Sequence, residues 1–167
     1  MSLMAFAQRH PDLLHTRVAG VALVATACGG LREPDLGLRP RIAGVANRLE
    51  RWSRTPLSSL PGPRLGGRTP WLRPGLRWLL FGSRPVKADL TTTAEAVAAC
   101  HPASLVAFRE SLAEHDRADA LAEFRAVPTI ILAGLAERLC TYAHTKRLAE
   151  AAPHAKLWLY GGAGHML

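Results

Sequence analysis

Three predominantly apolar, partly β-branched runs stand out along the chain, at residues 17–27, 127–134 and 155–160. Glycine ends or closely follows each run, and a short apolar run bounded in this way is typical of a buried strand in a parallel sheet. Between the last two runs, residues 142–152 place alanine and leucine at spacings that suit one face of a helix. The order strand, helix, strand predicts an α/β fold with a parallel sheet and helices packed on its faces.

Residues 2–9 have a helix-forming composition without glycine or proline, and they predict a helix that ends before Pro11. The long segment between the first two strands, residues 31–124, follows a different pattern because prolines interrupt its first part. Up to residue 85 they permit only short helices, such as 42–54 and 76–81. These prolines stand at positions 34, 40, 56, 61, 63, 70 and 74.

The second part of this segment is smoother, and residues 91–100 and 103–124 are expected to be helical. The chain therefore divides into a helix and strand in residues 1–30, a helical insertion in residues 31–124, and a strand–helix–strand unit in residues 125–167. The aromatic residues of the insertion include Trp52, Trp71, Trp78 and Phe81. They either line a pocket or pack the short helices onto their base, and the sequence leaves both readings open.

The composition fits one globular domain, because 49% of the 167 residues are apolar and 20% are charged. The longest run of apolar and small residues, 18–28, is about eleven residues long where a bilayer requires about twenty, so we expect no membrane span. The N-terminus lacks the pattern of a secretory signal. The three cysteines are widely spaced and odd in number, without a C-x-x-C pair, so we expect reduced thiols in a cytoplasmic protein.

The positive charge of the chain is concentrated in one segment. Residues 32–87 hold eleven arginines and one lysine against three acidic residues, a net charge of +9, whereas the whole chain carries +8. Surfaces that bind nucleic acid usually present basic residues as a face or a run beside aromatic residues or a known motif. Here the arginines are scattered among proline, glycine and leucine, so we expect no nucleic-acid partner.

Among the seven histidines, His165 has a position that predicts chemistry. It follows the last predicted strand in the sequence GGAGH (161–165), at the carboxyl end of the strand, where ligands and catalytic groups gather in open α/β sheets. Glu137 takes the equivalent place after the preceding strand. A carboxylate bonded to one ring nitrogen leaves the other nitrogen free as a general base, although a structural Glu–His pair has the same spacing.

The other six histidines are expected on the solvated surface. No H-x-x-x-H or C-x-x-C spacing indicates a metal site, so a metal ion would need ligands gathered from distant segments. We therefore expect no metal dependence.

The sequence around Glu137 and His165 resembles the α/β-hydrolase family. Residues 127–139, VPTIILAGLAERL, are similar to the family's strand and acid-bearing loop, and Glu137 falls on the acid. Residues 155–166, AKLWLYGGAGHM, look like the final strand and the G-x-G-H loop, in which His165 falls on the catalytic base. Residues 1–13 resemble the helix that follows the family's nucleophile elbow. The resemblance thus covers both ends of the chain, and the insertion between them takes the place of the family's variable cap.

The resemblance implies a partial α/β-hydrolase fold, with the last three parallel strands, flanking helices and a helical cap insertion. It also implies hydrolysis of an ester or related acyl bond in a small, apolar substrate by a Ser–His–acid mechanism without a cofactor, in which Glu137 holds the ring of His165. The alternative is a noncatalytic binding protein on a decayed hydrolase scaffold, which would hold an acidic partner with its arginine-rich insertion.

The nucleophilic serine of this pattern is not found in the chain. The family's G-x-S-x-G elbow would place the serine about four residues before Met1. Ser2 does not fit, because no glycine stands two residues after it and the strained turn needs small residues on both sides. The chain also stops two residues after His165, so we expect a hydrolase fragment that is inactive alone.

Overall fold

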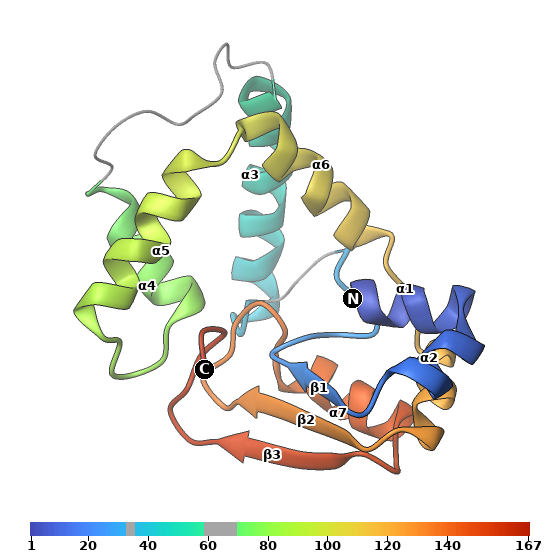
Figure 1. The fold of residues 1–167 in the computed structure, drawn as a ribbon. Helices are drawn as coiled ribbons and strands as arrows, with labels where there is room; N and C mark the ends of the chain where they lie inside the picture. The colour runs from blue at the N-terminus through green and yellow to red at the C-terminus, as the bar shows by residue number, and fades with distance from the viewer. Residues whose placement is uncertain (33–35, 59–69) are drawn as a thin grey trace.

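A three-stranded parallel sheet forms the centre of the computed structural model, which describes residues 1–32, 36–58 and 70–167 (Figure 1). Its strands are β1 (Val21–Val24), β2 (Thr129–Gly134) and β3 (Lys156–Tyr160), in the order β1-β2-β3. The register pairs Val21 with Thr129 and Gly134 with Tyr160, so β2 and β3 end at the same edge of the sheet. The three expected strands and their parallel arrangement are confirmed.

β1 is shorter than the predicted run of residues 17–27 for two local reasons. A second helix, α2 (Pro11–Arg17), begins directly at Pro11 and occupies the start of that run. Proline suits the first turn of a helix, where the missing N–H has no partner to lose. At the other end, Ala25 adopts a φ of 42°, in the left-handed region, and this conformation ends the strand.

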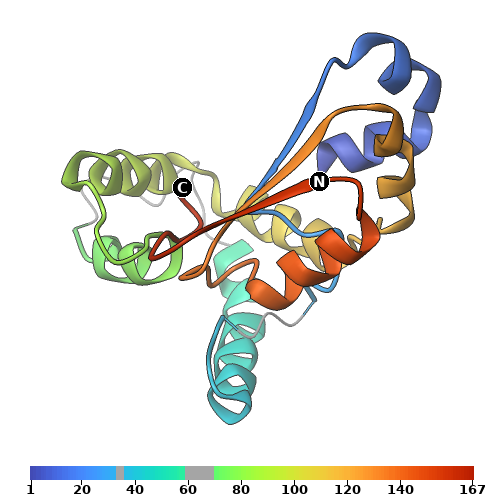
Figure 2. The same ribbon diagram turned by 90° about the horizontal axis from the view of Figure 1, so that it is seen from below.

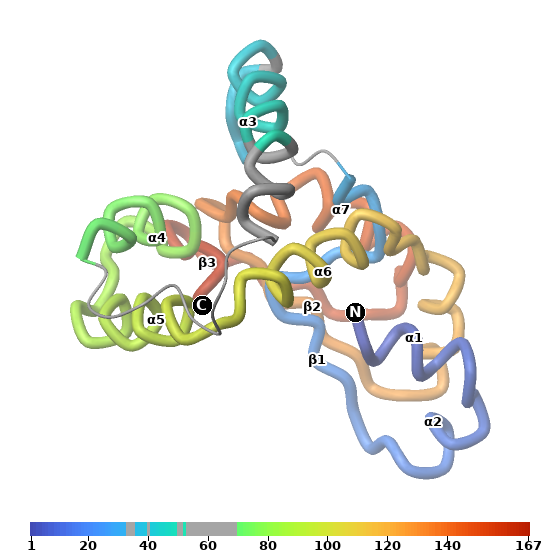
Figure 3. Tube along the Cα trace, turned by 90° about the horizontal axis from the view of Figure 1, so that it is seen from above, coloured from blue at the N-terminus to red at the C-terminus, as the bar shows by residue number. Residues whose placement is uncertain are grey.

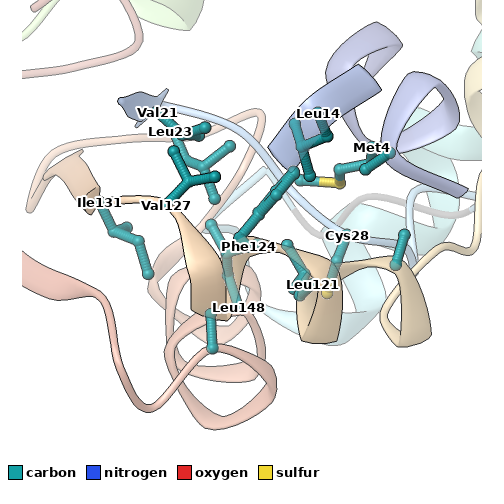
Figure 4. Packing of buried hydrophobic residues seen from close by; sticks show 13 residues of the cluster. Met4, Leu14, Val21, Leu23, Cys28, Leu121, Phe124, Val127, Ile131 and Leu148 are labelled. Carbon is teal, nitrogen blue, oxygen red and sulfur yellow. The ribbon is translucent and has the colours of Figure 1, made fainter. Parts of the chain in front are cut away.

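The main hydrophobic core lies between the sheet and the helices α1 (Ser2–Arg9), α2, α7 (Tyr142–Ala151) and the 3-10 helix η1 (Asp119–Ala126). Figure 4 shows its large side chains converging from all of these elements. The largest side chains with almost no exposure include Met4, Leu14, Leu121, Phe124, Ile131 and Leu148. Burial of each such side chain stabilises the fold by about 1.5–3 kcal/mol. Because these side chains come from the sheet and from the helices, the core holds the helices against the sheet.

β3 departs from the expectation of a strand buried on both faces, because all five of its residues are exposed. Trp158 and Tyr160 are exposed at 56% and 43%. The physical reason is that α7, which precedes β3 in the chain, packs on β2 and leaves the faces of β3 uncovered. An apolar strand without a covering layer is an aggregation-prone surface.

The middle segment, residues 31–124, contains α3 (Pro40–Ser58), α4 (Leu72–Leu80), α5 (Lys87–Ala99) and α6 (Pro102–Ala113). α3 packs on α6, α4 packs on α5, and the pair α4–α5 lies beside the carboxyl ends of the strands (Figures 1 and 3). The prediction of only short helices before residue 85 is wrong for α3, which has 19 residues. Pro40 is at its first position, where proline costs little because the N–H groups of the first turn have no partner within the helix. The prolines at 34, 61 and 63 lie outside the described residues.

The expected helical stretch 103–124 is divided in two. α6 ends at Ala113, and a turn leads to η1, which packs on α1. The first helix, Ser2–Arg9, and the helix between the last two strands lie where the sequence predicts them.

Candidate active site

Two loops at the carboxyl edge of the sheet position the predicted acid and base. Glu137 follows β2 by three residues, and His165 follows β3 by five. Backbone hydrogen bonds join the two loops, from the Leu135 N–H to the Tyr160 carbonyl at 3.0 Å and from the Ala136 N–H to the Ala163 carbonyl at 2.9 Å. The register of β2 and β3 thus continues beyond the strands and brings the two side chains together.

Glu137 and His165 form a direct hydrogen bond, with 2.8 Å between Nδ1 of the ring and Oε2 of the carboxylate. The other oxygen, Oε1, accepts the backbone N–H of Leu139 at 2.7 Å. The Glu137 side chain is 1% exposed, whereas the His165 side chain is 30% exposed. The carboxylate is therefore held from two sides inside the protein, while part of the ring is open to solvent.

Burial alone would raise the pKa of Glu137. The hydrogen bond and charge of His165, together with the backbone N–H groups of Leu139 and Cys140, outweigh burial and lower the pKa of Glu137 below its ordinary value. The carboxylate is ionised at neutral pH and can only accept hydrogen bonds. The proton of the neutral His165 ring is consequently on Nδ1, which leaves Nε2 with a free lone pair for a general base.

The ring of His165 lines a pocket of about 400 Å³ between the end of β1 and the acid loop. Val24, Leu31, Leu112 and Leu139 give this pocket a largely apolar wall. Pockets of this size and character hold small molecules, with a few polar groups to orient them. The ring nitrogen with the free lone pair therefore belongs to a side chain that such a pocket can bring next to a bound small molecule.

Cys140 lines the same pocket but does not provide a nucleophile. Burial and the nearby Glu137 carboxylate raise the pKa of its thiol to about 12, so it stays protonated at neutral pH. Ser2 is exposed and lines a different pocket, beside His115. Within the described residues, no serine, threonine or cysteine side chain forms a hydrogen bond with His165.

The loop that carries His165 is also held by the end of α4. The Met166 N–H donates to the Leu80 carbonyl, and the Ser83 N–H donates to the Gly162 carbonyl, both at 2.9 Å. The backbones approach so closely that a Cβ atom on Gly164 would lie 2.7 Å from the carbonyl carbon of Phe81. Glycine is required here by space, and the sequence pattern alone does not reveal this second support.

Trp52, Trp71, Trp78 and Phe81 differ in their surroundings in the structure. Phe81 is buried and, with Trp78, lines a pocket of about 390 Å³ beside the acid loop. The guanidinium of Arg138 lies 4.5 Å from the Trp78 ring centre, a cation–π contact between the acid loop and α4 that sequence reasoning missed. Trp52 and Trp71 are exposed at 77% and 68%, so neither belongs to the hydrophobic core of the described residues.

His115 corrects the expectation that the other histidines are solvated. It is partly buried after the end of α6, and within the described residues its Nε2 atom has no hydrogen-bond partner. Burial is the main reason that the pKa of His115 is lowered.

No group of three or more potential metal ligands occurs among the described residues. None of the helices in the described part of the chain has the length and apolar character needed to cross a bilayer.

Comparison with known proteins gives no matching family model and no matching curated protein. Solved structures do match. A thermophilic esterase from Thermogutta terrifontis has a TM-score of 0.63 at 19% identity, covering 98% of this chain and 53% of the esterase. The enol-lactonase from Burkholderia xenovorans LB400 has a TM-score of 0.63 at 19% identity, over 97% and 53%. An alpha/beta hydrolase enzyme from a Medee basin deep-sea metagenome library has a TM-score of 0.58 at 13% identity, over 98% and 54%.

These matches define the class of fold. The parallel sheet and its helices form part of an α/β-hydrolase fold, as the sequence resemblance implies. The chain spans about half the length of these solved structures.

Proposed function

We propose that this chain supplies the acid and the base of an α/β-hydrolase that cleaves ester or related acyl bonds. The observation that supports it best is the Glu137–His165 pair, joined at 2.8 Å with the carboxylate buried and the ring lining an apolar pocket. In this function Nε2 of His165 takes a proton from a serine hydroxyl and returns it to the leaving group. Glu137 orients the ring and stabilises the imidazolium that forms.

The serine comes from outside the residues described here. Two observations support this part of the proposal: no described hydroxyl group bonds to His165, and the solved structures with this fold are about twice as long as the chain. Residues 31–124 take the place of a cap, since α4–α5 lie at the carboxyl edge of the sheet, beside the acid loop and the histidine loop. The substrate is a small apolar ester, because the wall of the pocket is mainly apolar.

The test uses the complete polypeptide that contains this chain, with p-nitrophenyl esters as substrates. His165→Ala should lower kcat/KM at least about a thousandfold, because the proton acceptor is lost. His154→Ala is the matched control, since His154 is exposed in the turn before β3 and should keep full activity. Equal activity of the two variants would refute the assignment.

A fluorophosphonate probe, which reacts with activated serines, tests the location of the nucleophile. The 167-residue chain alone should remain unlabelled, and the complete polypeptide should be labelled at one serine. The His165→Ala variant of the complete polypeptide should not be labelled, because its serine is no longer activated. Labelling of the chain alone would place the nucleophile within it and contradict this part of the proposal.

A further inference from the structure

One face of α3 carries a stripe of large apolar side chains that nothing in the described structure covers. Ile42, Val45, Leu49 and Trp52 are exposed at 54%, 60%, 60% and 77%. Their spacing of three, four and three residues places them within an arc of about 80° on the helix surface, at about 100° per residue. Ala43, on the opposite side, is buried, and α3 packs on α6. We call these four residues the α3 stripe.

The position of α3 makes the stripe accessible. Figures 2 and 3 show the helix extending away from the sheet and from the pair α4–α5, so that much of its length projects from the body of the molecule. A helix of this kind in a globular domain normally turns its apolar face to the core. In the described part of α3, Ala43 faces the protein and the large apolar residues of the α3 stripe face outward, which is the reverse pattern.

Positive charge borders the stripe. Arg41 and Arg48 are exposed, and the helical period places both within about 40° of Trp52, at one margin of the stripe. No ion pair to Arg39, Arg41 or Arg48 is present among the described residues. The sequence of α3 contains four arginines and one glutamate. The described surface of α3 therefore combines the α3 stripe with the exposed Arg41 and Arg48, which have no ion-pair partner among the described residues.

We propose that α3 binds the surface of a membrane rich in anionic lipids. An interfacial helix lies in the plane of the membrane, with its apolar face among the acyl chains and its arginines beside the phosphate groups. Tryptophan suits this boundary because its ring is apolar and its N–H is polar. The inference is independent of the proposed hydrolase activity, since it rests on α3 alone.

The chemistry of the stripe favours lipid over a second copy of the chain or a nucleic acid. A second copy of the chain would bring two sets of arginines together, and this like-charge contact opposes pairing through the stripe. A nucleic acid would neutralise the arginines but would leave the aliphatic side chains without a partner. An anionic lipid surface satisfies both the charge and the apolar residues.

The test measures partition of the complete polypeptide that contains this chain onto vesicles by sedimentation, with Trp emission as a second readout. We expect binding to phosphatidylcholine–phosphatidylglycerol vesicles with a blue shift of emission, weaker binding at high salt, and little binding to phosphatidylcholine alone. Leu49→Glu should weaken partition at least about tenfold. Leu13→Glu is the matched control, because Leu13 is an exposed leucine of α2, outside the stripe, and should bind as the wild type does.

The charge requirement has its own pair of variants. Arg41→Gln combined with Arg48→Gln should weaken partition roughly thirtyfold, whereas Arg9→Gln with Arg17→Gln, also exposed, should have little effect. Absence of binding to anionic vesicles, or equal binding by Leu49→Glu and Leu13→Glu, would overturn the proposal. A wild-type dimer that Leu49→Glu converts to a monomer, without lipid binding, would assign the stripe to a second copy instead.

Discussion

Replacing Glu137 by glutamine tests the central contact of the site with almost no change in volume. The carboxylate accepts hydrogen bonds from His165 Nδ1 and from the Leu139 N–H, whereas an amide has one accepting and one donating end. If the amide oxygen keeps the backbone N–H, its NH₂ group faces Nδ1. The ring must then accept at Nδ1 and carry its proton on Nε2. The variant is expected to reverse the tautomer of His165 and to remove the free lone pair on Nε2.

The energetic cost follows from the same contacts. A hydrogen bond to a charged group contributes about 1.5–3 kcal/mol, and the 1% exposure of the Glu137 side chain leaves little solvent to compensate its loss. We therefore expect Glu137→Gln to lower the free energy of unfolding at neutral pH by roughly that amount. The matched control is Glu123→Gln, which breaks a 3.5 Å pair with His15 whose side chains are 40% and 36% exposed. This exposed pair should contribute less than about 1 kcal/mol.

The dependence on pH gives a further check. Because the folded-state pKa of Glu137 is below its ordinary value of 4.5, the contribution of its carboxylate is present above that pH and is lost as the pH falls through the folded-state pKa. The difference in stability between the wild type and Glu137→Gln should be full at neutral pH and should shrink in acid. Urea unfolding measures the stability, and the ¹⁵N shifts of the His165 ring report its tautomer. Equal stability of the Glu137 and Glu123 variants, with the proton still on Nδ1 in Glu137→Gln, would refute the reasoning.

Two further predictions concern the surroundings of the site. Gly164→Ala should lower the free energy of unfolding, measured with urea, by about 1–3 kcal/mol, because its Cβ would lie 2.7 Å from the Phe81 backbone after α4. Gly161→Ala should be nearly neutral, because the space around its Cβ is open. Similar losses for both variants would contradict the close approach at Gly164. Iodoacetamide should modify exposed Cys100 in the native chain, whereas Cys28 and Cys140 should react only after unfolding, because burial raises both their pKa values and shields them. Mass spectrometry measures the three rates, and early modification of Cys140 would show that the pocket is more open than described.

The support of the histidine loop by α4 has a consequence for the proposed enzyme. The middle segment and the base are joined by main-chain hydrogen bonds at Leu80 and Ser83, and the acid loop is joined to α4 through Arg138 and Trp78. A displacement of α4 by a bound substrate would therefore reach both members of the Glu137–His165 pair. This coupling follows from contacts on the backbone and one cation–π pair, which sequence patterns do not encode.

Sequence patterns were enough to predict the three strands, their parallel arrangement and the approach of Glu137 to His165. These features are local or periodic: continuous apolar runs define strands, and a side chain just after each of two neighbouring parallel strands reaches the same edge of the sheet. The resemblance around these two residues added the class of fold, which the solved structures confirm.

Which apolar surfaces are covered by other elements depends on the tertiary structure. The same kind of apolar run is largely buried in β2 but exposed in β3, because α7 packs on β2 and not on β3. The large apolar residues of α3 face outward for a similar reason, since α6 contacts the side that carries small residues. Hydrophobic periodicity specifies that a face is apolar, but the packing partner of that face depends on contacts between residues far apart in the chain.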